Sequence, residues 1–235
     1  MTLQSEGQFP PLPESCATYS ASMECSHPDA MKTVRVFVVV EGTNDIKFLK
    51  RISAVLHAAD STLPHLARWE KRGELIFVPT GGDLLSWWDR LAPLETPEFH
   101  LFDRELSPET ELRRKVVERV NRRPGCRAAL TKKRSVENYL HPQALLAAGG
   151  PAIDIGDFDA VPERVARHRF VASEPDISWG CLSRRARKRC CYHVKRWLNT
   201  HVVERMTPEL LAARDPDGEV VSWLESIREL AATDG

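Results

Sequence analysis

Apolar residues along the chain alternate between short runs typical of buried strands and longer stretches with helical spacing. Val34–Val40 is apolar throughout apart from Arg35, and its length and valine content are typical of a central parallel strand covered on both faces. In Asp45–Ala59, which follows, apolar residues recur at intervals of three and four, and this spacing predicts a helix. The patterned part of the chain therefore begins with a strand and a helix.

The same alternation continues as far as residue 130. It predicts further strands at Leu75–Val78, Phe99–Phe102 and Arg127–Leu130, and further helices directly after Gly81 and Gly82 and over Pro108–Val120. Strands that alternate with helices in this way indicate an α/β fold with a mainly parallel four-stranded sheet flanked by helices.

Three regions are expected. Residues 1–30 are rich in Pro, Ser, Gly and Glu without an apolar period, which predicts a disordered leader. Residues 31–150 should form the α/β domain, and residues 151–235 a helical C-terminal extension packed on it. Cys16, Cys25 and His27 in the leader lack the paired spacing and the fourth ligand of a zinc site, which favours free thiols.

Composition adds limits rather than a function. With 235 residues, 42% of them hydrophobic, the chain can build one full core. Lys+Arg and Asp+Glu both number 33, so no global charge indicates a polyanionic partner. No apolar stretch is long enough to cross a membrane and no signal peptide is evident, so we expect a cytoplasmic protein without a membrane partner. Its six cysteines are expected to be reduced thiols.

Two of the predicted strands end on acidic residues. Glu41 follows the first strand and Asp103 the third, with Glu105 two residues further on. Neighbouring parallel strands lie ~5 Å apart, so these acids can share one cation such as Mg²⁺, which prefers carboxylate and water oxygens. The alternative is that Glu41 and Asp45 cap the following helix and that the segment from Asp103 to Glu105 is a polar turn. Spacing alone leaves both interpretations open.

The order of three sequence blocks resembles a known family. VVVEGTND, then FHLFDRE, then TKKRSVENYL resemble the TOPRIM domain of topoisomerases, primases and related nucleases, and most closely its version in the OLD (overcoming lysogenization defect) nucleases and their stand-alone relatives. The resemblance covers Val34 to Leu145. Each motif alone is short, but the resemblance is specific because all three occur in the family's order and next to predicted strands.

This resemblance implies a divalent-metal-dependent nuclease that cleaves phosphodiester bonds with one or two Mg²⁺ or Mn²⁺ ions. The implied metal ligands are Glu41, Asp45, Asp103, Glu105 and Glu137. Glu41 is also implied as a general acid or base, and Glu41, Asp103 and Lys133 are the candidate catalytic residues. The family's D-x-D is D-x-E here, because Glu105 replaces the second aspartate, so the second metal position is where the chain departs from the pattern.

Two basic segments are candidates for contact with nucleic acid, DNA being favoured. Lys132, Lys133 and Arg134 precede Glu137 and would bring positive charge to a phosphate beside the acids. The second segment interleaves basic residues with Tyr192 and Trp197, a combination typical of backbone binding and base stacking; its basic residues are Arg184, Arg185, Arg187, Lys188, Arg189, Lys195 and Arg196. The alternative for both segments is a solvated polar face or a surface for an acidic partner.

Several functions remain open at this stage. No P-loop is present, so an ATPase or sensor, which OLD nucleases carry on the same chain, would be a separate partner, as in two-component phage-defence systems. A TOPRIM protein that has lost cleavage and binds nucleic acid or a partner protein is one alternative, and a primase-type nucleotidyl transferase is another. A homodimer is also left open.

Overall fold

The computed structural model describes residues 34–83 and 86–233, all within one compact unit. The expected leader, with Cys16, Cys25 and His27, lies outside the described residues. The described cysteines, Cys126, Cys181, Cys190 and Cys191, are free.

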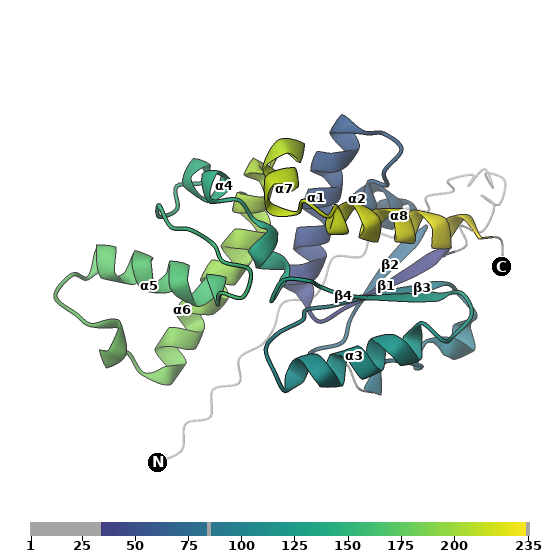
Figure 1. Ribbon diagram of the computed structural model, residues 1–235, viewed down its shortest axis with the longest axis horizontal. Coiled ribbons are helices and arrows are strands. Elements are labelled where there is room, and N and C mark those ends of the chain that lie inside the picture. Colours follow the sequence, from purple (N-terminus) through teal and green to yellow (C-terminus); the bar gives the residue numbers. More distant parts are fainter. Residues whose placement is uncertain (1–33, 84–85, 234–235) are drawn as a thin grey trace, which may run out of the picture. The chain divides into compact units, whose positions relative to one another are not determined.

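Four strands form one parallel sheet (Figure 1). They are β1 (Val36–Val40), β2 (Leu75–Pro79), β3 (Glu98–Phe102) and β4 (Cys126–Leu130), in the order β2-β1-β3-β4. The predicted α/β class and parallel sheet are thus confirmed, with each strand within two residues of its expected bounds. Every residue of β1 and β3 is buried, whereas β2, at one edge, alternates between buried and exposed positions. The central strands are apolar because both of their faces are covered.

Helices cover the two faces of the sheet. On one face, the apolar residues of α1 (Thr43–Ala59) and α8 (Glu219–Ala232) share a buried cluster with β1 and β3; on the other, α3 (Glu109–Val120) packs its Val116 and Val120 against Phe102. Figure 1 shows α1 and α8 above the strands and α3 below them.

One helical prediction was wrong, and one helix was not predicted. Among the described residues 86–91 that follow the glycine pair, the backbone forms turns rather than the expected helix. Gly81 and Gly82 have φ angles of 69° and 90°, and the carbonyl of Trp88 accepts a hydrogen bond from Arg123 instead of from its own segment. The unpredicted helix is α2 (Leu66–Arg72), which ends at Gly73.

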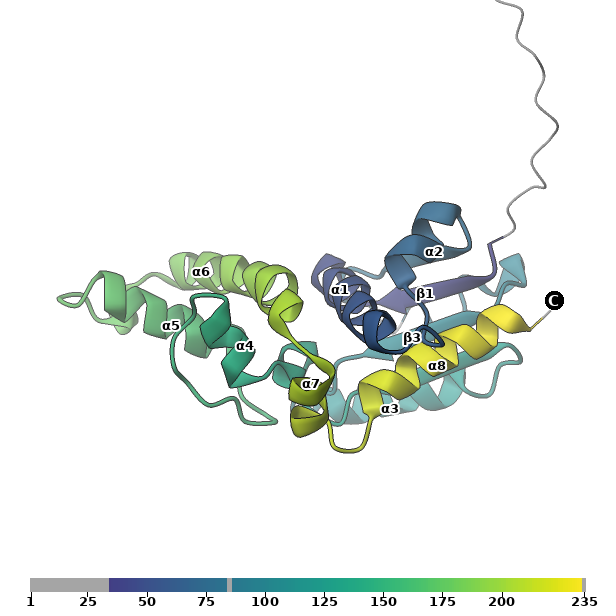
Figure 2. The ribbon, with the colours of Figure 1, turned by 90° about the horizontal axis from the view of Figure 1, so that it is seen from above.

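The remaining helices form the second half of the chain. They are α4 (Pro142–Ala147), α5 (Val161–Ser173), α6 (Arg184–Trp197) and α7 (Pro208–Arg214), with 3₁₀ turns at Ala92–Leu94, Val136–Tyr139, Trp179–Cys181 and Val203–Arg205. Helices α5 and α6 pack side by side, and α6 continues into a π-helical turn, Leu198–Val202, that contacts α1 (Figure 2). This turn brings the end of α6 to α1, one of the helices that cover the sheet. No helix among the described residues is both long and apolar enough to span a bilayer.

Candidate functional site

The two acids that end the central strands lie side by side. Strands β1 and β3 are paired in parallel, so Glu41 and Asp103 leave the sheet at the same end. The backbone N–H of Asp103 donates to the Glu41 carboxylate at 3.1 Å. This end of the sheet is where functional groups of open parallel sheets usually gather.

Asp45 lies in the first turn of α1 and combines two environments. Its Oδ2 accepts a hydrogen bond of 2.8 Å from the backbone N–H of Gly42, so the helix-capping alternative holds for this oxygen. Its Oδ1 is buried and has no hydrogen-bond partner among the described residues. A buried carboxylate oxygen without a donor is costly unless a cation or water satisfies it.

Glu137 is held against the same end of the sheet by the 3₁₀ turn that begins after Ser135. The Ser135 hydroxyl donates to Oε2 of Glu137 at 2.7 Å, and Nδ2 of Asn199 donates to Oε1 at 2.6 Å. The turn is fixed to β3 because the Val136 N–H donates to Oδ1 of Asp103 at 3.0 Å. Glu137 is only 1% exposed, so its charge is felt by its neighbours with little screening.

We refer to Glu41, Asp45, Asp103 and Glu137 as the acid cluster. Burial raises the pKa of Asp45 to about 6, with the charge of Glu137 adding to the effect and that of Lys195 opposing it. Burial also raises the pKa of Asp103 well above its usual value, and the charges of Asp45, Glu137 and Glu105 raise it further. The carboxylates of Asp45, Asp103 and Glu137 therefore share one field of negative charge, which favours a bound cation.

Glu105 lies at the rim of this cluster. Its backbone has a φ of 53°, its N–H donates to the carbonyl of Arg134, and its carboxylate accepts from Nε of Arg134 at 3.2 Å. The side chain is about one third exposed. The glutamate of the D-x-E block is thus paired with an arginine at the edge of the site.

Lys195 enters the acid cluster from α6. Its Nζ lies 3.5 Å from Oε1 of Glu137, and the charges of Glu137, Asp103 and Asp45 raise the pKa of its ammonium. Sequence reasoning grouped Lys195 with the other basic residues of α6, whereas the structure places it among the acids. Asn199, four residues later, was missed, because nothing in its local pattern distinguishes it from a surface asparagine.

Arg113 is a second residue that sequence reasoning missed. It lies on α3 and donates to both carboxylate oxygens of Glu41, the Nη2 to Oε2 distance being 3.3 Å, and to the carbonyl of Asp103 at 2.6 Å. Its position in a run of charged residues, ETELRRK, gives no signal that would separate it from its neighbour Arg114. It positions Glu41 and supplies the positive charge nearest to that carboxylate.

The predicted basic residues fall into two groups. Lys132, Lys133 and Arg134 are each paired with a carboxylate: their partners are Asp217, Asp157 and Glu105, respectively. Lys133 also lies over the ring of Tyr139, 5.6 Å from its centroid, and so its ammonium is not directed at the acid cluster. In contrast, the basic residues of α6 other than Lys195 form no ion pair with any described carboxylate; they are Arg184, Arg185, Arg187, Lys188, Arg189 and Arg196.

Within residues 34–83 and 86–233, no three His, Cys, Asp or Glu side chains are arranged to hold a metal ion on their own. Mg²⁺ does not require such a cage, since it commonly uses one or two carboxylates and keeps several water ligands. The unpartnered Oδ1 of Asp45 and the raised pKa of Asp103 fit such a hydrated ion. Asp45 and Asp103 are thus the residues that would hold it, with Glu41 and Glu137 close by.

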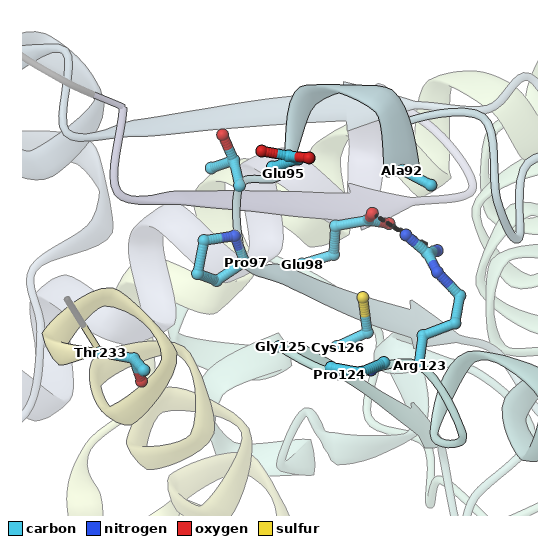
Figure 3. Close-up of a pocket in the computed structure, with 10 residues that line it drawn as sticks. Ala92, Glu95, Pro97, Glu98, Arg123, Pro124, Gly125, Cys126 and Thr233 are labelled. Atoms are coloured by element: carbon cyan, nitrogen blue, oxygen red, sulfur yellow. Dashed lines mark hydrogen bonds and ion pairs between the residues drawn. The ribbon is translucent and has the colours of Figure 1, made fainter. Parts of the chain in front are cut away.

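A cavity of 430 Å³ opens at the opposite end of the sheet, where β3 and β4 begin (Figure 3). Its one buried carboxylate, Glu98, forms an ion pair with Arg123 and lies 2.7 Å from Nε2 of His100. Burial, aided by the charge of Glu98, raises the pKa of the Cys126 thiol to about 11, so that it stays protonated. With its buried carboxylate paired and its thiol protonated, this cavity lacks the reactive groups that the acid cluster has.

Comparison with protein-family models found no match, and comparison with curated proteins found none either. Among solved structures, the chain is similar to the C-terminal region of the OLD protein of Xanthomonas campestris pv. campestris. Against the structure of that region phased with iodine, the identity is 15%, the TM-score is 0.46, and the match covers 85% of this chain and 96% of the other. Against those phased with platinum and mercury, the identities are 15% and 14%, both TM-scores are 0.43, and the match covers 85% of this chain and 94% or 97% of the other.

Proposed function

We propose that this chain is a divalent-metal-dependent nuclease that cleaves phosphodiester bonds in nucleic acid, with DNA as the first substrate to test. One observation carries the proposal: buried carboxylates from three separate segments, Asp45, Asp103 and Glu137, share one field of negative charge with a single lysine, Lys195. Carboxylates that are costly without a cation, next to a fixed ammonium, are suited to phosphoryl chemistry.

The chain's own residues would divide the work as follows. A bound Mg²⁺ or Mn²⁺ would polarise the phosphoryl oxygens and favour ionisation of a water molecule. Asp45 and Asp103 would hold the ion, and Arg113 would orient Glu41 for proton transfer. Lys195 would stabilise the negative charge that develops on the phosphoryl group. We assign this last role to Lys195 rather than to Lys133, because the ammonium of Lys133 is paired with Asp157.

A protein that binds nucleic acid without cleaving it is the second candidate. It is favoured by the engagement of both Glu41 oxygens by Arg113, which leaves that carboxylate less free to act on water or metal. Partnership with a separate ATPase or sensor, and a role in phage defence, remain predictions from the sequence resemblance.

Cleavage assays separate these candidates. The purified protein is incubated with supercoiled plasmid, linear DNA and RNA in the presence of Mg²⁺, Mn²⁺ or EDTA. The nuclease should cleave at least one substrate with metal and none with EDTA, and Glu41→Ala and Asp103→Asn should each reduce the rate by about 100-fold or more. Glu118→Gln, which removes an exposed acid of α3, is the matched control and should cleave normally.

Two results would contradict the proposal. If Glu41→Ala cleaves as fast as the parent, the acid cluster is not the catalytic site. If the parent cleaves no substrate with either metal but binds nucleic acid, the second candidate takes the place of the first.

A further inference from the structure

Three basic residues of α6 lie on one face of the helix. Successive residues of an α-helix are rotated by about 100°, so positions 4, 7 and 11 residues apart fall within about 40° of one another. Arg184, Lys188 and Lys195 have these spacings within the regular part of α6. We call them the α6 stripe. One end of the α6 stripe is Lys195, whose ammonium lies in the acid cluster, and the other end lies about three turns away.

The outer part of the stripe carries charge that the chain does not neutralise. Arg184 and Lys188 are exposed, and neither forms an ion pair with a described carboxylate. The other basic candidates behave differently, since Lys132, Lys133 and Arg134 are all paired. Cations that stay free beside a site for phosphate chemistry are available to replace the counterions of a nucleic-acid backbone.

We propose that the α6 stripe binds the sugar–phosphate backbone of one substrate strand and leads that strand into the acid cluster. The placement relative to the cleaved bond rests on the proposed nuclease function, but the binding surface does not. About 16 Å of helix separates Arg184 from Lys195, enough to accompany roughly four or five phosphates at ~3.4 Å of axial spacing per strand. The protein therefore binds the phosphates on one side of the cleaved bond more strongly than those on the other side.

The helix that carries the stripe is capped at its start and packed against other elements near its end. At its start, the Ser183 hydroxyl accepts a hydrogen bond of 3.2 Å from the Ala186 N–H. Near its end, the guanidinium of Arg169 on α5 lies 3.7 Å from the ring centroid of Trp197, and Asn199 in the π-helical turn ties α6 to Glu137. A rigid support aligns the charges before the substrate arrives and lowers the entropic cost of binding.

The same helix supplies a matched control. Arg185 and Arg189 are also exposed and unpaired among the described residues, but they centre about 100° around the helix from the stripe. The double variants Arg184→Ala/Lys188→Ala and Arg185→Ala/Arg189→Ala each remove two positive charges from exposed positions of one helix. Both should fold normally, as judged by circular dichroism and thermal unfolding, because alanine favours the helix.

Binding is measured by fluorescence anisotropy with labelled duplex DNA in EDTA, so that cleavage cannot occur. Over salt concentrations from about 50 to about 200 mM, the slope of log K (the association constant) against log salt should be less steep by about 1.8 for the stripe variant. Each lost phosphate contact reduces the steepness by ~0.9. At the low end of that range its affinity should fall on the order of ten-fold to a hundred-fold. The control variant should show less than half of each change. Equal changes in both variants, or no change in either, would overturn the stripe.

A second experiment tests whether binding is stronger on one side of the cleaved bond. Once the cleavage position has been mapped, the duplex is synthesised with four neutral methylphosphonate linkages on one side of it or on the other. Neutral linkages on one side only should weaken binding by the parent, and the stripe variant should lose this difference. Equal weakening from both sides would overturn the placement. If the parent protein binds DNA through the α6 stripe but cleaves nothing, only the proposed nuclease function is contradicted. If the parent cleaves DNA but the two double variants weaken binding equally, only the proposed role of the α6 stripe is contradicted.

Discussion

At the scale of single residues, Asp45 is the clearest case of a side chain whose ionised form is disfavoured in the folded protein. Its carboxylate is buried and close to Glu137, and its pKa is raised to about 6. A carboxyl group whose pKa is higher in the folded than in the unfolded chain costs nothing at low pH, where both states bind the proton. The cost appears as the pH rises from about 4 to about 6 and is then fully present.

Asp45→Asn should therefore stabilise the protein in the absence of divalent metal. Asparagine keeps an acceptor for the Gly42 N–H and removes the buried charge. At pH 7.5 in EDTA, we expect the free energy of unfolding to increase on the order of 2 to 3 kcal/mol. The gain should shrink towards zero near pH 4, which chemical denaturation at the two pH values would measure. A gain that does not depend on pH would show that the charge is not its cause.

Replacing Arg113 should have the opposite effect on the free energy of unfolding and lower it. Without the Arg113 guanidinium, the partly buried carboxylate of Glu41 loses two hydrogen-bond donors. Arg113→Ala should lower the free energy of unfolding by about 2 kcal/mol, less than for a fully buried pair because both side chains retain some solvent contact. Urea denaturation measures the loss, and Arg114→Ala, at the exposed neighbouring position, should change stability by less than about 0.5 kcal/mol.

At the scale of elements, the sequence predicted what local pattern determines. The central strands are short runs of buried residues, and α1 and α3 carry buried residues at helical spacing, so the bounds of these elements were predicted closely. The segment after Gly82 also resembles a helix start. This segment forms turns instead, and its Trp88 carbonyl accepts a hydrogen bond from Arg123, which comes from a different part of the chain. A tertiary hydrogen bond of this kind leaves no local pattern.

The candidate site divides along the same line. Glu41, Asp45 and Asp103 could be named as candidates from the sequence because they follow strands or start a helix, and their positions depend only on local order. Asn199 joins them from the π-helical turn that follows α6, and Lys195 joins them from the regular part of α6 just before that turn. Neither the turn nor the approach of the end of α6 to α1 is encoded in the spacing of apolar residues.

Helix α8 shows that the C-terminal residues contribute to the core of the sheet. Trp223 is 2% exposed and packs edge to face against Tyr139, with ring centroids 5.3 Å apart. Trp223→Ala should lower the free energy of unfolding by about 3 to 5 kcal/mol, because a large cavity would open beneath the helix. Chemical denaturation provides the measurement, with the exposed Ser222→Ala on the same helix as control. A loss below about 1 kcal/mol would mean that α8 is dispensable for the core.

At the scale of the whole molecule, the acid cluster joins segments that are distant along the chain. Its residues and Lys195 come from the ends of β1 and β3, the start of α1, the turn at Val136–Tyr139, and α6. These segments belong to the sheet, to a helix that covers it, and to the helical second half of the chain. A cation bound here would therefore interact only with the assembled fold, since the unfolded chain scatters the ligands. Its binding energy should stabilise the described unit as one cooperative body.

Mg²⁺ or Mn²⁺ should accordingly raise the melting temperature of the parent protein. At a metal concentration of about 100 times Kd, the gain is about 2.7 kcal/mol by mass action, which corresponds to a shift of roughly 5 to 10 °C for a chain of this size. Asp103→Asn and Glu41→Gln should lose most of this shift, because each removes a negative charge that the cation compensates. Glu118→Gln should keep all of it, since that acid lies exposed on α3, away from the cluster. Differential scanning calorimetry with and without metal gives the shift, and a single transition would show that the whole unit responds together. If both cluster variants respond to metal as the parent does, the acids do not share a cation and Asp45 is only the helix cap of α1.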